Sequence, residues 1–135
     1  MSDSASVIEE YYNHLKNRDR EKLLALLSPD IEITYHSQPE QFPWSGKFHG
    51  IEGFDRFFSI LKDYLEVVEV SIAHSTTTDD SVINQCEGRW KFKQSGYVVA
   101  GDMVNVFRVS GGKISAYEVY ADTAEFAKGF ATLSE

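Results

Sequence analysis

The chain has 135 residues, a usual length for one domain, and 42% of them are apolar, enough to fill one core. Its net charge of −8 argues against binding nucleic acid or an anionic membrane surface, because both need a basic face. Cys86 is the single cysteine, so no intrachain disulfide can form. Residues 1–6 lack the features of a secretory signal, and no apolar run could span a bilayer. We therefore expect a cytoplasmic protein with one domain over residues 1–135.

The N-terminal third predicts two helices and a strand. Apolar residues at helical spacing predict an amphipathic helix over 7–15. A second, shorter helix is expected to begin after Asp19, which can cap it, and to keep Leu27 on its buried side before the sequence Ser28-Pro29-Asp30 ends it. Apolar and polar residues then alternate over 31–36, which predicts a strand.

The middle of the chain predicts a long loop and a third helix. Residues 37–50 contain two prolines, two glycines and Trp44, and long loops in compact domains are often functional. Apolar residues at helical spacing over 51–65 predict a helix with a strongly apolar stripe.

The second half predicts strands, separated by turns, over 68–72, 82–93, 97–109 and 113–121. Asp122 and Glu125 resemble a capping box, which predicts a short last helix. Helices followed by a run of strands favour an α+β fold. The expected order is β-α-β-β-β-β after two N-terminal helices. We expect three helices to cup one face of a curved antiparallel sheet around an apolar pocket.

The sequence contains no strong local catalytic motif, so candidate site residues follow from which side chains share a strand face. If Trp90 faces inward, so does Cys86, and if Phe107 faces inward, so do Met103 and Asn105. We expect an apolar, ligand-binding lining made of Trp44, Cys86, Trp90, Met103, Phe107, Tyr117 and Val119.

Four polar residues are the candidates for catalysis: Tyr11, Tyr35, His36 and Asn105. A buried amide needs a partner, so Asn105 could meet a ligand oxygen; the alternatives are a neighbouring side chain or a trapped water. The tyrosines could donate to a substrate oxygen, or they could be core aromatics. His36 suits a general base near neutral pH, although strand parity points it away from Tyr35. No spacing suggests a metal site, and we expect no cofactor.

Several ordered segments carry a resemblance to a known superfamily. They include Phe48-His49-Gly50-Ile51-Glu52-Gly53 before the third helix, Asn105-Val106-Phe107-Arg108-Val109 in a late strand, and Tyr120-Ala121-Asp122 near the end. The whole pattern resembles the nuclear transport factor 2-like superfamily, and within it the SnoaL-like and ketosteroid isomerase-related proteins. The resemblance implies a cone-shaped α+β barrel with a deep apolar pocket, and a homodimer formed through the outer sheet face.

The resemblance does not carry one particular reaction over to this chain. Tyr11 matches the oxyanion-hole tyrosine of ketosteroid isomerase, but Asn105 and Tyr35 stand where that enzyme has aspartates. Limonene epoxide hydrolase would need an arginine and two aspartates at positions that here hold Cys86, Gly88 and Val119, and SnoaL-like cyclases place an acid near Val119. The candidate residues of this chain can donate hydrogen bonds, but none of them matches a catalytic acid of these enzymes.

Three hypotheses stay open at this point. The protein could be an isomerase, cyclase or hydratase acting on an apolar, oxygen-bearing compound, or it could bind such a compound without changing it. The alternative is a non-catalytic dimerising interaction domain with a vestigial pocket. Fold alone does not decide among them.

Overall fold

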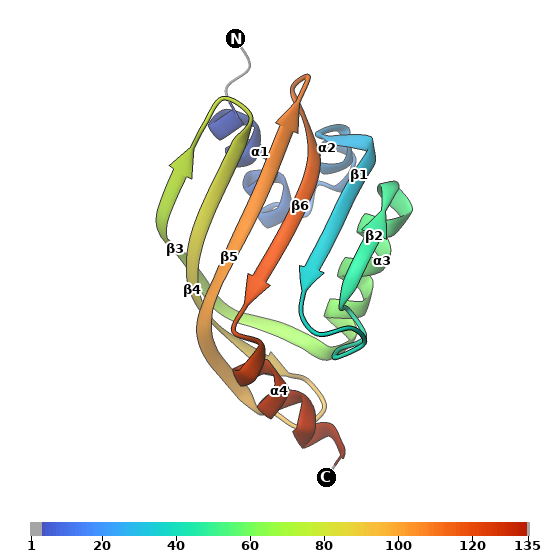
Figure 1. The fold of residues 1–135 in the computed structure, drawn as a ribbon, viewed down its shortest axis with the longest axis vertical. Coiled ribbons are helices and arrows are strands. Elements are labelled where there is room, and N and C mark those ends of the chain that lie inside the picture. Colours follow the sequence, from blue (N-terminus) through green and yellow to red (C-terminus); the bar gives the residue numbers. More distant parts are fainter. Residues whose placement is uncertain (1–3, 135) are drawn as a thin grey trace.

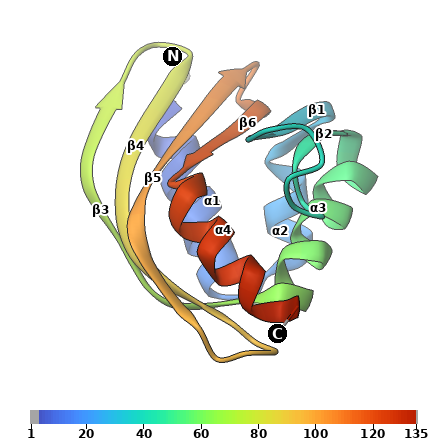
Figure 2. The same ribbon diagram turned by 60° about the horizontal axis from the view of Figure 1, so that its bottom comes forward.

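The computed structural model describes residues 4–134, and it confirms an α+β fold built on one curved, open sheet (Figure 1). Within these residues the strands are β1 (Leu27–His36), β2 (Gly46–His49), β3 (Leu65–Thr77), β4 (Ser81–Phe92), β5 (Val98–Ser110) and β6 (Lys113–Ala121). The helices are α1 (Ser4–Lys16), α2 (Arg20–Ala25), α3 (Gly50–Tyr64) and α4 (Thr123–Ala131), and a 3-10 turn follows at Thr132–Ser134. The helices lie inside the curve of the sheet, on what we term its inner face (Figure 2).

The strands are arranged in the order β2-β1-β6-β5-β4-β3. The pairs from β3 to β6 are antiparallel neighbours, as expected for strands joined by short turns. β1 instead pairs with β6 in parallel. The sequence predicted a wholly antiparallel sheet, so this pair is a difference from the prediction. Because most of the chain separates these two strands, no tight turn fixes their relative direction.

Several boundaries differ from the sequence prediction. β3 runs over Leu65–Thr77, where a strand over 68–72 was expected. Leu27 was expected in the second helix, but α2 ends at Ala25 and β1 begins at Leu27, which pairs with Ile114. The Ile114 N–H donates to the Leu26 carbonyl oxygen at 2.8 Å, so sheet pairing takes over where the helical pattern would have continued. The predicted loop 37–50 also contains β2, whose four residues are too few to show a periodic signal.

The predicted helix caps are confirmed. The Asp19 carboxylate accepts a hydrogen bond from the Lys22 N–H at 3.2 Å at the start of α2. The Asp122 carboxylate accepts one from the Glu125 N–H at 3.3 Å at the start of α4. These contacts satisfy backbone donors that a helix N-terminus leaves unpaired, so α4 begins where the capping signal placed it.

Gly129 lets α4 pack closely on the sheet. A Cβ atom there would lie 3.0 Å from Val99 Cγ2 and closer still to the ring of Phe92. Replacing Gly129 with alanine should lower the free energy of unfolding by about 1–3 kcal/mol, because a packed core cannot take the extra methyl group. Urea unfolding measures the change. Gly101→Ala is the control, since its new Cβ would make an ordinary 3.5 Å contact with Asp122; equal losses in both variants would contradict the prediction.

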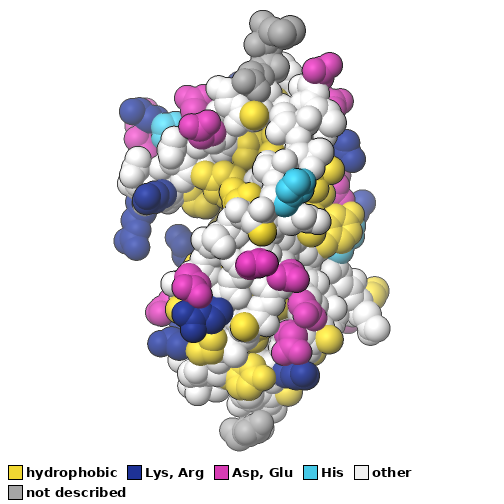
Figure 3. Space-filling view, turned by 90° about the vertical axis from the view of Figure 1, so that its left-hand side faces the viewer, with side chains coloured by type: hydrophobic (Ala, Val, Ile, Leu, Met, Phe, Trp, Pro, Cys, Tyr) yellow, Lys and Arg dark blue, Asp and Glu magenta, His cyan; other side chains and the backbone are white. Residues whose placement is uncertain are grey.

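The strand β3 forms one edge of the sheet and is only partly covered by the helices. The side chains of Val67, Val70 and Ile72 pair with inward-facing positions of β4, yet they are 61%, 42% and 48% exposed. Figure 3 views the molecule from this side and shows hydrophobic side chains gathered there. α1 therefore leaves a strip of the inner face open along β3. In the part of the chain described, no helix is long and apolar enough to cross a membrane.

Candidate functional site

A groove of about 290 Å³ lies on the inner face, between α1 and the strands β3 and β4. We call it the α1–β3 groove. Its lining includes Ile8, Glu9 and Tyr12 from α1, Ile72 and Ser75 from β3, and Asn84 from β4. Its volume is at the lower end of the range for small-molecule sites, and its walls combine aliphatic side chains with a few polar groups, as such sites do.

A chain of polar side chains runs from this groove into the protein interior. Ser75 Oγ donates to Asn84 Oδ1 at 2.6 Å, and Asn84 Nδ2 donates to the Tyr12 hydroxyl oxygen at 3.3 Å. The Asn105 side chain lies close enough to the Tyr12 phenol to lower its pKa in part. We call Ser75, Asn84, Tyr12 and Asn105 the polar chain.

The sheet register brings the polar chain together. Asn84 on β4 lies opposite Ser75 on β3 and opposite Asn105 on β5. Residues directly opposite each other in antiparallel strands project from the same face, so the three side chains form a row on the inner face. Tyr12 reaches that row from α1.

The environment of Tyr12 keeps its phenol protonated and available as a donor. Burial raises the pKa of Tyr12, and the neighbouring side-chain amides of Asn84 and Asn105 lower it in part. Because the phenol oxygen already accepts from Asn84, its own hydrogen is free to point elsewhere. Tyr12 lines the groove, so a ligand oxygen in the groove can receive that hydrogen.

Asn105 is the most unusual member of the polar chain. Its side chain is 5% exposed, and its Oδ1 atom has no hydrogen-bond partner among the described residues. Buried polar atoms are nearly always paired, so an unpaired one often marks a functional position. The phenol beside Asn105 is that of Tyr12.

Tyr11 lies in an aromatic core next to the polar chain. Its ring centroid is 5.4 Å from that of Phe107, which stacks on Tyr117 at 4.9 Å. Burial raises the pKa of Tyr11 and, strongly, that of Tyr117. Val119 is also buried on this face. These four predicted site residues are close together, but none is among the residues that line the groove.

Cys86 and Met103 lie opposite each other on β4 and β5. Cys86 is buried, its Sγ is 4.0 Å from the Asn84 carbonyl oxygen, and burial raises the pKa of its thiol. A thiol held protonated in this way is a poor nucleophile, and neither Cys86 nor Met103 is among the residues that line the groove. Met103 is half-buried.

Trp44 is fully buried and occupies the space between the inner face of the sheet and α4. It stacks on Phe42 with ring centroids 4.9 Å apart, and Tyr64 and Phe130 pack around it. Its indole N–H approaches the Tyr35 phenol closely enough to lower that group's pKa in part, but without the geometry of a hydrogen bond. Burial raises the pKa of Tyr35 overall. The loop that was expected to line a pocket thus supplies core instead.

Trp90 is buried on β4 and packs against Phe126 of α4, with ring centroids 5.3 Å apart. Its position joins the last helix to the sheet. It is not among the residues that line the groove.

His36 lies on the outer face of the sheet. Its Nε2 atom is 2.8 Å from Glu118 Oε1, and its ring stacks on Tyr120 at 4.0 Å. Strand parity predicted that it points away from Tyr35, and the structure places it accordingly. His36 is therefore not brought together with the inner-face candidates Tyr11, Tyr35 and Asn105.

Sequence reasoning missed Tyr12, Asn84 and Ser75. Asn84 precedes Cys86 by two residues and so shares its strand face, a signal that parity could have given. Tyr12 follows Ile8 by one helical turn, which also places it near the buried side. Ser75 carried no usable signal, because its position depends on irregular pairing between β3 and β4.

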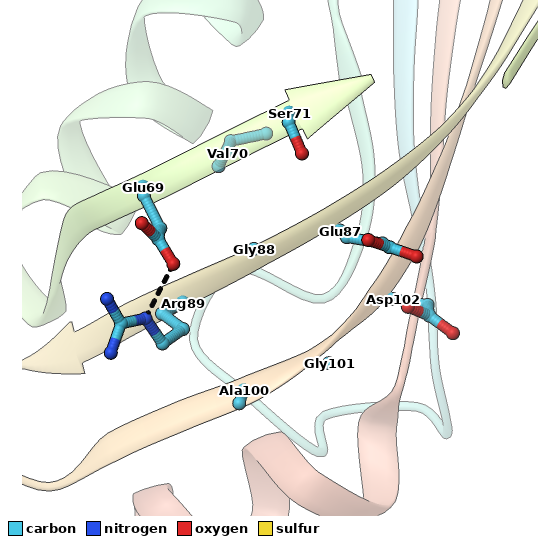
Figure 4. Close-up of a pocket in the computed structure, with 9 residues that line it drawn as sticks. All are labelled: Glu69, Val70, Ser71, Glu87, Gly88, Arg89, Ala100, Gly101 and Asp102. Atoms are coloured by element: carbon cyan, nitrogen blue, oxygen red, sulfur yellow. Dashed lines mark hydrogen bonds and ion pairs between the residues drawn. The ribbon is translucent and has the colours of Figure 1, made fainter. Parts of the chain in front are cut away.

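A second hollow, of about 520 Å³, lies on the outer face of β3, β4 and β5. Figure 4 shows Arg89 paired with Glu69, while Glu87 and Asp102 lie on neighbouring strands. The Arg89 Nε to Glu69 Oε1 distance is 2.8 Å, and both side chains are about half exposed or more. Over residues 4–134, no group of three or more His, Cys, Asp or Glu residues is placed to hold a metal ion. This hollow is an open, charged surface.

Comparison with known proteins identifies the family of this chain. The model of the SnoaL-like domain matches residues 8–117. The chain belongs to the SnoaL-like family. No curated protein matches its sequence significantly.

Solved structures share the fold of this SnoaL-like protein at low sequence identity. A nuclear transport factor 2-like protein from Burkholderia thailandensis is 21% identical, covers 96% of this chain and 98% of its own, and has a TM-score of 0.82. TerC, co-crystallised with polyporic acid, is 18% identical, with coverage of 94% and 97% and a TM-score of 0.78. A protein from Mesorhizobium loti, named as a SnoaL-like polyketide cyclase, is 20% identical, with coverage of 86% and 97% and a TM-score of 0.68.

Proposed function

We propose that this SnoaL-like protein binds a small, apolar, oxygen-bearing compound in the α1–β3 groove. Tyr12 donates a hydrogen bond to the ligand oxygen, and Ile8, Ile72 and Val82 contact the apolar part. One observation carries the proposal: Tyr12 lines the groove while its phenol oxygen already accepts from Asn84, so its hydrogen is available to a further partner.

The buried part of the inner face offers hydrogen-bond donors and amides, and the carboxylate that lines the groove, that of Glu9, is solvent-exposed. The buried polar residues of the described chain, besides its tyrosines, are Ser4, Ser81, Asn84 and Asn105. None of them is a carboxyl or an imidazole, so no buried group is suited to act as general base. This favours binding over isomerase, cyclase or hydratase turnover. The names of TerC's ligand and of the Mesorhizobium loti protein support a small-molecule role for the fold, and they leave the chemistry of this chain to experiment.

Substituting Tyr12 with phenylalanine should weaken ligand binding about 3- to 10-fold, because one hydrogen bond is lost while the ring remains. The measurement is a thermal-shift screen of apolar ketones and alcohols of one ring, such as benzylacetone. A ligand present at about 100 times its dissociation constant adds about 2.7 kcal/mol and raises the midpoint by several degrees. Asn105→Leu should also weaken binding, since it removes the amide behind Tyr12.

The adjacent Tyr11→Phe variant is the matched control, because Tyr11 does not line the groove. It should bind the same compounds as the unaltered protein. If Tyr11→Phe loses binding and Tyr12→Phe keeps it, the site lies in the aromatic interior and the groove is the wrong location.

A dimerising interaction domain is the second candidate function. It is favoured by the aromatic filling around Trp44, which occupies space that a ligand pocket could use, and by the exposed Val98 and Tyr120 on the outer sheet face. Two outer faces could then pair in a homodimer. If no ketone, alcohol or related compound shifts the midpoint, and the protein sediments as a dimer that Tyr120→Glu dissociates, this second function replaces the first.

A further inference from the structure

We infer that the ligand of the α1–β3 groove is a cationic amphiphile, with an acceptor oxygen at Tyr12 and an amine near Glu9. This inference rests on the proposed function and adds the charge class of the ligand. The groove supplies a donor and a carboxylate from one helix, with aliphatic walls on either side. An amino ketone or amino alcohol on a small apolar frame matches these three features.

Charge is the first argument. Glu9 lines the groove, and none of the described residues that line it is basic. Lys16 lies one turn beyond Tyr12 on α1, outside the lining. Glu9 is solvent-exposed, so its carboxylate attracts a cationic ligand and repels an anionic one by the modest energy of a surface charge pair. The net charge of −8 adds to this preference through the long-range field.

Geometry is the second argument. Glu9 and Tyr12 are three residues apart on α1, so their Cβ atoms lie about 5–6 Å apart on one face of the helix. Both residues line the groove, so a donor and a carboxylate are available along the same space. A ligand that meets Tyr12 at one end has Glu9 within reach of its other end.

Size is the third argument. The groove volume of about 290 Å³ is roughly twice that of an engineered apolar cavity that binds benzene. One ring with a short side chain fits such a space, and a larger ring system would extend into solvent. Ile8, Ile72 and Val82 supply the apolar contacts for that ring.

The test compares benzylacetone with its para-aminomethyl and para-carboxy derivatives. These compounds keep the ring and the ketone and differ in charge at the far end. Binding is measured by NMR titration at physiological ionic strength, and shifts of the Asn84 and Asn105 side-chain amide signals report whether the groove is occupied. We expect the aminomethyl compound to bind about 5-fold more tightly than benzylacetone, and the carboxy compound about as much more weakly.

Glu9→Gln should bring the aminomethyl compound to within about 2-fold of benzylacetone, because the ion pair is lost. Glu10→Gln is the matched control: it removes the same charge from an exposed neighbour that does not line the groove. It should leave the preference in place.

The outcomes distinguish the inference about ligand charge from the proposal that the groove binds a ligand. If the carboxy compound binds as tightly as the aminomethyl compound, or if Glu10→Gln acts as strongly as Glu9→Gln, the inference about charge is wrong while groove binding stands. If none of the three compounds shifts the Asn84 and Asn105 signals, groove binding fails and the inference falls with it.

Discussion

Replacing Trp44 with alanine is expected to lower the free energy of unfolding by about 3–5 kcal/mol. Trp44 is fully buried, and the rings of Phe42, Tyr64 and Phe130 lie around it with centroids 4.9, 5.7 and 6.1 Å away. Removing the indole leaves a cavity that these rings cannot fill, so both the burial of apolar surface and the packing contacts are lost. A whole domain is stable by only about 5–15 kcal/mol, so this single change removes a large share.

Urea unfolding followed by circular dichroism measures the loss. Trp44→Phe is the informative comparison: it keeps a ring in the cavity and removes an N–H that has no partner, so it should cost much less than the alanine variant. A loss below about 1 kcal/mol for Trp44→Ala would contradict the packing of the 37–45 segment against the core.

Stability should fall steeply above about pH 10, by about 2 kcal/mol or more between pH 10 and pH 11. Burial raises the pKa of Tyr11 and Tyr117 above the ordinary value of 10.0. Above pH 10 the unfolded chain releases both protons while the folded protein keeps them, which favours unfolding by about 1 kcal/mol per group over the first pH unit and by about 1.4 kcal/mol per group and pH unit further on. Below pH 10 both states keep these protons, and the contribution is constant. Tyr12 and Tyr35, whose pKa values are also raised, add to the fall.

Urea unfolding on both sides of pH 10 gives the slope. Tyr11→Phe should reduce the slope of unfolding free energy against pH by the contribution of one proton, because one titrating group is gone. Phe107→Leu, a change in the same aromatic core, should lower the whole curve without altering its slope. An unchanged slope in Tyr11→Phe would show that the buried phenols do not cause the alkaline loss.

Local signals in the sequence placed much of the fold. Asp19 and Asp122 marked the starts of α2 and α4 because a cap is a contact within one turn. Strand parity placed Asn105, Phe107 and Cys86 inward and His36 outward, because side chains alternate strictly along a strand. Both kinds of signal depend on neighbours close in the chain.

Other features had no local signal. β2 is held by pairing with β1, and Leu27 enters a strand because β6 lies beside it. Trp44 was expected to line a pocket, but Phe42 and Phe130 close around it, and only their arrangement in space decides that. Of the two neighbouring tyrosines on α1, Tyr12 lies beside Asn105, since the rotation of the helix against the sheet sets which phenol meets that residue.

The sequence by itself determined the α+β class, the order of the main elements and the inward position of Asn105, because periodicity and capping are properties of short segments. The tertiary structure alone decided that Tyr12, Asn84 and Ser75 form a polar chain beside a groove. Tyr12 and Asn84 are 72 residues apart, and Ser75 faces Asn84 only through an irregular strand register. Contacts of that kind arise from packing between elements, and no short-range pattern encodes them.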